Sequence, residues 1–257
     1  MAITSYPPFV SFQASVAAPW ELAVARGAVS GVTGLNIFGN TQVLGSTAYG
    51  PLWEAGTPSG GYYVYPSSAA QMSLVSSSAS DTSAVTVFVD GLDSGFNLQS
   101  ETIALNGTTP VTTVKSYLRI NGLNVVTGTN VGALTMSNGG TTYAKVIAGV
   151  GQTQMSIYTV PNNYTFYYTY LQADANTSTV SSGWVNAGEY NVNNALASKP
   201  QTFLSQLTFL TALNLSLTVP IGHTGKTDIQ WVFKASTGTN SYCNCYIGGY
   251  LIANGTP

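Results

Sequence analysis

The side chains that could take part in catalysis are few in this sequence. It has nine acidic residues, seven basic residues and one histidine among 257 residues, and His223 lies in a glycine-containing stretch that predicts a loop. A Ser-His-Asp triad would need His223, but no Gly-x-Ser-x-Gly motif accompanies it. No phosphate-binding loop or dinucleotide fingerprint is present either. The sequence therefore predicts a protein that is not an enzyme, without catalytic residues and without a cofactor.

The acidic residues offer only weak candidate sites. The Asp-Thr-Ser stretch at 81–83 resembles the loop of aspartic proteases, but that chemistry needs a second copy, which is absent. We therefore interpret Asp81 as a turn residue that caps nearby backbone groups. Asp90 and Asp93 flank a Gly-Leu pair, where a calcium site is an alternative to a plain turn, although the ligand density is low. Three further charged residues are interpreted as isolated surface charges or a structural ion pair: Glu21, Arg26 and Glu101.

The two cysteines, Cys243 and Cys245, are separated by one residue. On a strand both side chains point to the same face, and a disulfide between them would strain the backbone. A metal site would need further ligands, and His223 is the only histidine. We therefore predict two small buried apolar side chains, no metal, and synthesis in a reducing cytoplasm.

The composition excludes several classes of partner. Charged residues make up 6% of the chain, against roughly a quarter in ordinary domains, and no Lys/Arg cluster exists that could neutralise phosphates. Nucleic acid and membrane surfaces are therefore not expected partners. The first residues lack the pattern of a signal peptide, and no run of about 18 apolar residues occurs that could span a membrane.

Alternation of apolar and polar residues predicts strands along most of the chain. It is clear at 85–89, 164–170, 213–219 and 228–234, with turn residues between the runs. In the predicted strand 116–126 the alternation changes phase at Gly122, which predicts a β-bulge. Two segments fit helix and strand alike, and we favour strand for both: 18–27 and 202–212.

The predicted fold class is all-β, an antiparallel β-sandwich of jelly-roll type, possibly with two β subdomains. The proposed division is an N-terminal arm at 1–17, a first β unit at 18–150 and a second, jelly-roll-like sandwich at 151–257. A glycine-containing stretch at 149–152 is the candidate hinge. Few charged residues are available to protect the strand edges from pairing with other chains. We therefore expect closure of the sheets or neighbouring subunits to cover these edges, and we expect a homotrimer.

Tyrosine-rich segments are the candidate contact surfaces. Sixteen tyrosines occur, and tyrosine suits both strands and interfaces, so sheet packing, a protein partner and a sugar are all open for these segments. An N-terminal arm stiffened by Pro-Pro could enter a groove on a neighbour or pack on its own domain. The candidate interface residues are Tyr6, Pro7, Pro8, Phe9, Tyr62, Tyr63 and Tyr65.

Three segments, at 20–39, 72–113 and 148–161, and more weakly a fourth at 217–235, resemble virion structural proteins of marine tailed bacteriophages. The similar motifs are strand and turn motifs without a catalytic signature. The chain departs from that group after residue 84, where it lacks a Gly-Thr-Gly-type insertion, and it has little charge in its last third.

The resemblance implies a β-rich virion component made in the host bacterial cytoplasm. We expect a capsid decoration, or cement, protein that binds the major capsid protein or other virion proteins and stabilises the assembled head. The alternative is a tail-associated, receptor-binding protein that binds host glycans.

Overall fold

The computed structural model describes residues 19–41, 44, 46–56, 60–176, 184–199, 201–236 and 242–255. Within these residues the chain forms sixteen strands in four antiparallel sheets and one short helix, α2 (Trp20–Ala25). The predicted all-β, antiparallel class is confirmed. None of the helices in the described ranges has the length and apolar character needed to span a bilayer.

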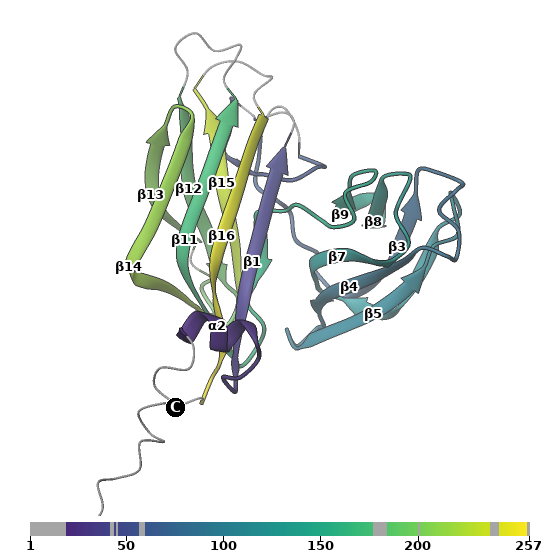
Figure 1. The fold of residues 1–257 in the computed structure, drawn as a ribbon, viewed down its shortest axis with the longest axis horizontal. Helices are drawn as coiled ribbons and strands as arrows, with labels where there is room; N and C mark the ends of the chain where they lie inside the picture. Colours follow the sequence, from purple (N-terminus) through teal and green to yellow (C-terminus); the bar gives the residue numbers. More distant parts are fainter. Residues whose placement is uncertain are drawn as a thin grey trace, which may run out of the picture.

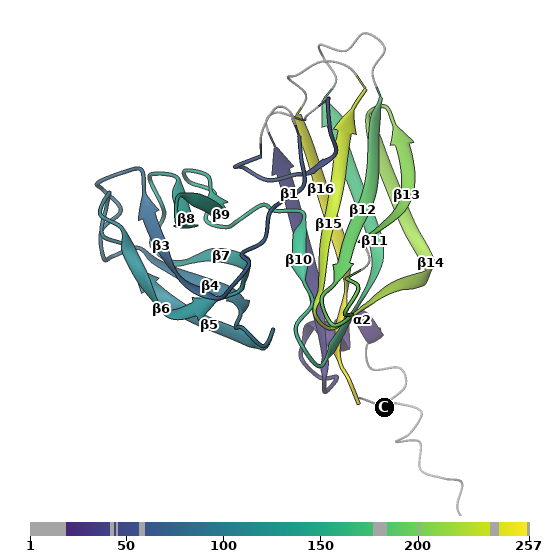
Figure 2. The same ribbon diagram turned by 180° about the vertical axis from the view of Figure 1, so that it is seen from behind.

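Two sheets, A and B, pack face to face to form the larger unit (Figures 1 and 2). Sheet A contains, in spatial order, β1 (Val32–Thr41), β16 (Tyr242–Ala253), β11 (Tyr164–Asn176) and β14 (Ala212–Thr224). Sheet B contains β10 (Ile157–Thr159), β15 (Thr227–Ala235), β12 (Val185–Asn193) and β13 (Gln201–Phe209), with β2 (Gly50–Pro51) also paired to β15.

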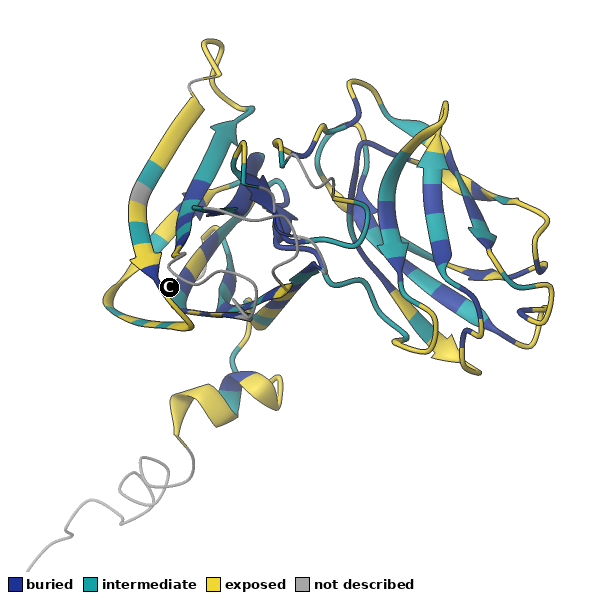
Figure 3. Cartoon of the chain, turned by 90° about the horizontal axis from the view of Figure 1, so that it is seen from above, coloured by how far each residue is buried: buried dark blue, intermediate teal, exposed yellow. Residues whose placement is uncertain are grey.

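One buried cluster fills the space between sheets A and B. It takes alternate residues of the strands, such as Phe166 and Tyr168 from β11 and Ile229, Trp231 and Phe233 from β15. The polar residues between them point outward on β11, as period-two alternation requires. Viewed from above, buried residues lie between the sheets and exposed residues on the outer faces (Figure 3).

A smaller unit is formed by sheets C and D around a second buried cluster. Sheet C contains β6 (Val111–Tyr117), β3 (Ala70–Ser76), β8 (Leu134–Asn138) and β9 (Thr141–Val146). Sheet D contains β5 (Leu98–Ala104), β4 (Thr86–Leu92) and β7 (Arg119–Thr127). At the sheet edges β5 lies beside β6 and β7 beside β9, so the two sheets almost close on each other.

The smaller unit is inserted into the larger one. β2 and β10 pair with consecutive parts of the same edge of β15, at Val232–Phe233 and at Asp228–Gln230. The chain leaves and returns at adjacent points, because the Ser156 N–H donates to the Leu52 carbonyl (2.9 Å) and the Leu52 N–H donates to Ser156 Oγ (2.8 Å). β2 and β10 therefore act as one strand beside β15, and the smaller unit is inserted between them.

This insertion corrects the predicted unit at 18–150. β1 pairs along its full length with β16, from Val32–Ile252 to Thr41–Cys243, so residues 32–41 belong with the C-terminal strands. The sequence between 151 and 257 is not a separate sandwich without them. Alternation identifies strands but contains no information on which distant strand each one joins.

Three local predictions can be compared with the structure. The stretch at 18–27 contains helix α2, so the preference for strand was wrong there, whereas 202–212 lies in β13 and the start of β14 as predicted. The pairing of β4 with β7 shifts between Asp90–Gly122 and Gly91–Ile120, which confirms the predicted bulge beside Gly122. The predicted strand 116–126 is in fact divided between β6 and β7.

Candidate functional site

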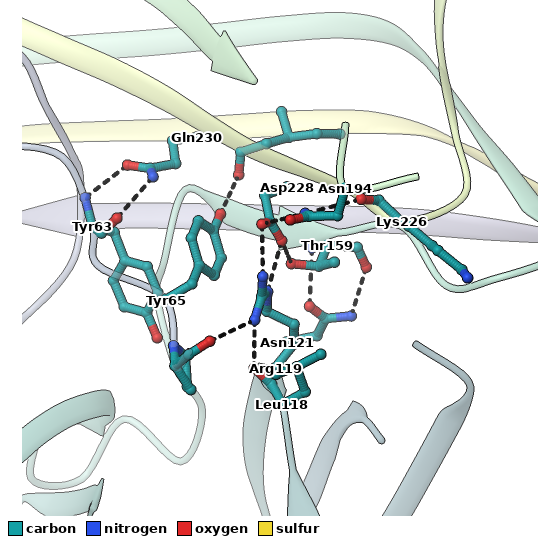
Figure 4. A network of polar contacts seen from close by, with 12 residues as sticks. Tyr63, Tyr65, Leu118, Arg119, Asn121, Thr159, Asn194, Lys226, Asp228 and Gln230 are labelled. Atoms are coloured by element: carbon teal, nitrogen blue, oxygen red, sulfur yellow. Dashed lines mark hydrogen bonds and ion pairs between the residues drawn. The ribbon is translucent and has the colours of Figure 1, made fainter. Parts of the chain in front are cut away.

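The most extensive polar network in the described residues joins the two units (Figure 4). Arg119, at the start of β7 in the inserted unit, faces Asp228 on β15 of the larger unit. Arg119 Nε donates to Asp228 Oδ1 at 2.7 Å, and Nη2 donates to Oδ2 at 2.8 Å. Both residues are 5% exposed. A two-bonded guanidinium–carboxylate pair fixes orientation as well as distance.

The remaining polar atoms of this ion pair are also occupied. Asp228 accepts hydrogen bonds from Thr159 Oγ1 and Asn194 Nδ2, both at 2.7 Å. Arg119 Nη1 donates to the carbonyl oxygens of Pro66 (3.0 Å) and Leu118 (2.8 Å). No acid, base or nucleophile of the pair is therefore left to act on a substrate, and the network is structural.

Aromatic rings enclose the guanidinium of Arg119. Its Cζ lies 4.7 Å from the ring centroid of Tyr65 and 5.2 Å from that of Phe96. The Tyr65 hydroxyl donates across the junction to the Ile229 carbonyl (3.2 Å). The raised pKa of Tyr65 follows first from its burial and then from the Asp228 carboxylate.

Two further amide side chains bridge the units. Gln230 accepts from the Tyr63 N–H at 2.8 Å and donates to the Tyr63 carbonyl at 3.0 Å. Asn121 makes the same two-way contact with the backbone of Thr159, at 3.0 Å in each direction. The two units are consequently held by paired, directional bonds on both sides of Arg119 (Figure 4).

These contacts involve two of the candidate interface residues. Tyr63 is 6% exposed, so its ring is not presented to a partner, whereas Tyr65 is half-buried with one face of its ring over Arg119. Tyr62 is 43% exposed and stacks on Tyr190, with centroids 4.1 Å apart. The other four candidates, Tyr6, Pro7, Pro8 and Phe9, lie outside the described residues.

His223 does not lie in a loop, as the sequence predicted, but near the end of β14, 6% exposed. The turn falls two residues later, where Lys226 takes a left-handed conformation (φ 66°). His223 Nε2 is 3.1 Å from Glu189 Oε1, and the imidazole stacks on Tyr168 with the rings 7° from parallel. This buried pair in the core of the larger unit is shielded from a substrate.

Asp81 is fully buried and binds backbone groups. It accepts hydrogen bonds from Ser76 Oγ (2.5 Å) and from the N–H groups of Val131 (2.7 Å) and Gly132 (2.9 Å). Burial raises the pKa of this carboxyl, but the three hydrogen bonds outweigh it and hold the pKa below its ordinary value. The interpretation of Asp81 as a capping residue is confirmed, although two of its partners lie about fifty positions away.

The two aspartates considered for calcium have separate environments. Asp93 Oδ1 accepts from the N–H groups of Gly95 (2.7 Å) and Asn97 (2.9 Å), which is the geometry of an Asx turn. Asp90 lies on β4, opposite Gly122 of β7. Across the described ranges no group of three His, Cys, Asp or Glu side chains could hold a metal ion.

The remaining charged candidates are peripheral. Glu101 accepts from the N–H groups of Val114 (2.9 Å) and Lys115 (3.1 Å), a bridge between neighbouring strands at the surface. Glu21 and Arg26 are both exposed at α2. Within the described part of the chain the one ion pair between an arginine or lysine and a carboxylate is Arg119–Asp228, so Glu21 and Arg26 do not pair.

Cys243 and Cys245 are free thiols, 0% and 5% exposed, on the inner face of β16. This confirms the prediction of two small buried side chains on one face. Burial raises the pKa of Cys245 to about 12, and burial together with Cys245 and Asp174 raises that of Cys243. Both thiols are therefore poor nucleophiles in the folded protein.

The outer face of sheet A presents aromatic and amide side chains. Phe38 of β1, Tyr246 of β16 and Tyr170 of β11 form a row across three strands, with centroid separations of 5.3 and 5.7 Å. The Tyr246 hydroxyl donates to Asn36 Oδ1 at 2.9 Å, and the Tyr170 hydroxyl lies 3.3 Å from Asn214 Oδ1. This face can offer ring surfaces and neutral hydrogen-bonding groups to a ligand.

Two hollows flank β1, and Asn36 lines both. One is a groove of about 250 Å³ on the outer face of sheet A, beside α2. The other is a cleft of about 220 Å³ between β1 and the inserted unit, where Asp90 lies among amide side chains that include Asn121 and Asn124. Burial raises the pKa of Asp90 to about 6, against the hydrogen bond from the Gly91 N–H that lowers it. A single carboxyl lines this cleft, whereas a glycosidase needs two.

Comparison of the chain with family models, with curated proteins and with solved structures found no match.

Proposed function

We propose that this chain is a non-enzymatic structural protein of a bacteriophage virion, a capsid decoration protein that binds the assembled head shell and stabilises it. The observation that carries the proposal is the strand order of sheets A and B. The buried titratable groups and the neutral polar surface support it further.

We infer from the strand order that the larger unit is a jelly roll. If β2 and β10 count as one interrupted strand, the eight strand positions in chain order form one sheet in the order 1-8-3-6 and the other in the order 2-7-4-5. This is the order produced when two Greek keys fold over each other, an architecture common in viral capsid and lectin domains. The inserted unit then occupies the second strand position.

A four-bladed β-propeller, with the four sheets arranged around one axis, is less consistent with the packing than a jelly roll. In a propeller, each sheet packs against the sheets on both sides around a central channel. Here the buried apolar residues form two clusters, one between sheets A and B and one between sheets C and D. Two sandwiches linked by a polar junction describe these clusters more simply.

The placement of the charged residues favours binding over catalysis. Arg119, Asp228 and Asp81 are used to hold loops and units together, and His223 is buried against Glu189. What remains on the surface is mainly hydroxyl, amide and aromatic, which repels partners weakly. Such a surface suits a protein whose work is contact.

An exposed apolar edge supports self-association into a trimer. On β14, Val219 is 77% exposed, and Leu210, in the turn that precedes β14, is 63% exposed; Phe203 of the neighbouring β13 is 42% exposed. These strands end sheets A and B on the side away from the inserted unit (Figure 1). A second copy, or the major capsid protein, could cover this edge and its unpaired backbone groups.

A decoration protein acts through linkage. Because it binds the assembled shell and not the separated subunits, each bound copy lowers the free energy of the shell. An interface of standard size, about 1,600 Å² in total, is sufficient for specific binding. The two rigidly joined units would let one copy contact two shell subunits with a fixed spacing.

Heads that lack the protein test this proposal. Phage would be grown with the gene disrupted, the heads purified, and the temperature of DNA release measured with a DNA-binding dye, before and after adding the purified chain. We expect the release temperature to rise as the chain is added and then to saturate. Heads that do not bind the chain, or bind it without a change in release temperature, would contradict the proposal.

Matched variants make the same experiment specific to the edge. V219K places a charge on the exposed edge strand, and V114K places one on β6, where Val114 is 85% exposed. We expect V219K to bind heads more weakly and to lose self-association, and V114K to behave as the original chain. Equal behaviour of the two variants would show that this edge is not the contact.

A second candidate function is a tail-associated, receptor-binding protein that contacts host glycans. The tyrosine-lined groove on sheet A is the observation that favours it, because aromatic rings beside amides suit sugars. Copy number separates the candidates: a decoration protein is present in hundreds of copies per particle, a tail protein in about six to eighteen.

A further inference from the structure

The groove between α2 and the outer face of sheet A has the features of a ligand site. Three tyrosine rings line it, Tyr170, Tyr246 and Tyr250, together with Asn36 and Thr169. Trp20 of α2 packs edge-on against Tyr250, with centroids 4.5 Å apart, and so supports the ring of Tyr250 beside the groove. The rings come from β11 and β16, the two central strands of the sheet, which makes the groove wall rigid.

Glycines form the floor of the groove. Gly249 is required by the fold, because a Cβ there would lie 2.3 Å from the Tyr167 carbonyl oxygen, and Gly248 faces the Tyr246 hydroxyl. Gly34 has no such reason, since an added Cβ would meet only Val24 Cγ1, at 4.0 Å, and its φ is not in the left-handed region. Glycine within a strand weakens the strand, so glycine at position 34 lowers the stability of β1 but keeps the groove open.

The chemistry of the lining identifies the class of ligand. Aromatic faces carry negative charge and attract the polarised C–H bonds of a sugar ring, and amide, hydroxyl and carboxylate groups bind its hydroxyls. Glu21 is the only charged residue that lines the groove, and no lysine or arginine lines it within the described part of the chain. Phosphate, sulfate and sialic acid would therefore meet no cation here, whereas a neutral sugar needs none.

The size of the groove limits the ligand. At about 250 Å³ it lies just below the 300–1,000 Å³ typical of sites for drug-sized ligands, which suits one sugar ring. Asn36 and Phe38 extend the surface over β1 toward the cleft that holds Asp90, so a longer glycan could continue there. We propose that this groove binds a neutral sugar residue of a surface glycan, stacked against Tyr246 and Tyr170.

This inference deepens the receptor-binding candidate and does not depend on the decoration role. A chain that binds sugar but is absent from particles would contradict the virion proposal alone. A chain that is part of the particle but binds no sugar would contradict this inference alone.

The test is nuclear magnetic resonance of the full-length ¹⁵N-labelled chain titrated with the methyl glycosides of glucose, galactose, mannose and N-acetylglucosamine, and with glucose 6-phosphate as the charged probe. We expect at least one neutral glycoside to shift the backbone amides of Gly34, Gly248 and Gly249 and the Trp20 indole in a saturable way. Glucose 6-phosphate should shift them less than methyl glucoside does. Absence of saturable shifts with all four neutral glycosides would overturn the proposal.

Three variants locate the binding. Y246A removes the central ring and should weaken binding about tenfold, the effect of losing one aromatic contact. G34V fills the floor at a position where an added Cβ would meet only Val24 Cγ1, at 4.0 Å, and should abolish binding while the chain keeps or raises its melting temperature. Y242A removes another tyrosine from the outer face of β16, 53% exposed and outside the groove, and should bind as the original chain does.

Two results would overturn the location. Equal loss of binding in Y242A and Y246A would show that the groove is not the site. If G34V left sugar binding intact but abolished self-association, as measured by light scattering, the groove would be an interface between copies of the chain.

Discussion

Arg119 and Asp228 lie 109 positions apart in the chain, yet they form a two-bonded ion pair inside the protein, with N–O distances of 2.7 and 2.8 Å. Each belongs to a different β unit, and each makes two further hydrogen bonds. The pair therefore helps to fix the relative orientation of the two units. This makes the pair the natural place to test the architecture.

Removing one partner of the pair should destabilise the whole chain. In R119M the Asp228 carboxylate stays buried without its counter-ion, which typically costs about 3–5 kcal/mol of unfolding free energy. R119K should recover little, because an ammonium cannot make the two parallel bonds. Urea denaturation measures both, with R26M, at an exposed arginine, as a control expected within about 0.5 kcal/mol of the original.

The same variant, R119M, tests whether the ion pair couples the unfolding of the two units. In R119M the bonds of Gln230 and Asn121 across the junction remain. These bonds alone should couple the two units more weakly, so we expect a single unfolding transition to become two, as the inserted unit unfolds apart from the larger unit. An R119M chain as stable as the original would show that the pair does not hold the units together.

The strands were predictable from the sequence, but their partners were not. Alternation of Leu213, Leu215 and Leu217 with polar residues identified an amphipathic strand, and the structure has these leucines packed on the core. Nothing local indicates that residues 32–41 pair with 243–252, because pairing of distant strands depends on the whole topology. The insertion at Leu52 and Ser156 was missed for the same reason.

The polar contacts between the two units could not be predicted from sequence patterns either. Arg119 stands in an alternating stretch, where a charged residue normally marks the solvent face, and only tertiary contacts make its position an interior one. His223 was placed in a loop because glycines flank it at 222 and 225, yet the turn begins after it. By contrast, the spacing of Cys243 and Cys245 was sufficient to predict their common buried face.

Asp90 should make stability fall as pH rises from about 4 to about 6. Its pKa is raised to about 6 in the folded chain from 3.8, so the folded state binds the proton more tightly than the unfolded state. Stability from this group is complete below about pH 4 and is lost as pH rises through about 6, on the order of 3 kcal/mol. D90N should remove this dependence and be the more stable chain at pH 7. Carboxyl-carbon NMR would contradict this if Asp90 titrated below pH 4.5.

Asp81 should have the opposite pH dependence. Its pKa is lowered in the folded chain, because its hydrogen bonds outweigh burial, so its contribution is present above the unfolded pKa of about 4 and is lost as pH falls below it. D81A leaves the N–H groups of Val131 and Gly132 unpaired and should cost about 2–4 kcal/mol. Urea unfolding measures this cost, with T82A at the exposed neighbour as a control that should change little. A D81A chain of unchanged stability would contradict the capping role.

The two thiols should be unreactive until the chain unfolds. Burial raises the pKa of Cys243 and Cys245, so almost no thiolate is present at pH 8. Titration with a thiol reagent should detect no reactive cysteine in the native protein and two in 8 M urea. Rapid native labelling would show that the inner face of β16 is accessible, which the packing between sheets A and B does not allow.

We propose that this chain works as a component of a phage particle, through contact and not through chemistry. Quantitative mass spectrometry of purified particles, with the major capsid protein as the internal reference, tests it most directly. The account predicts hundreds of copies per particle, retained through a density gradient. Particles that contain none of this chain would contradict it.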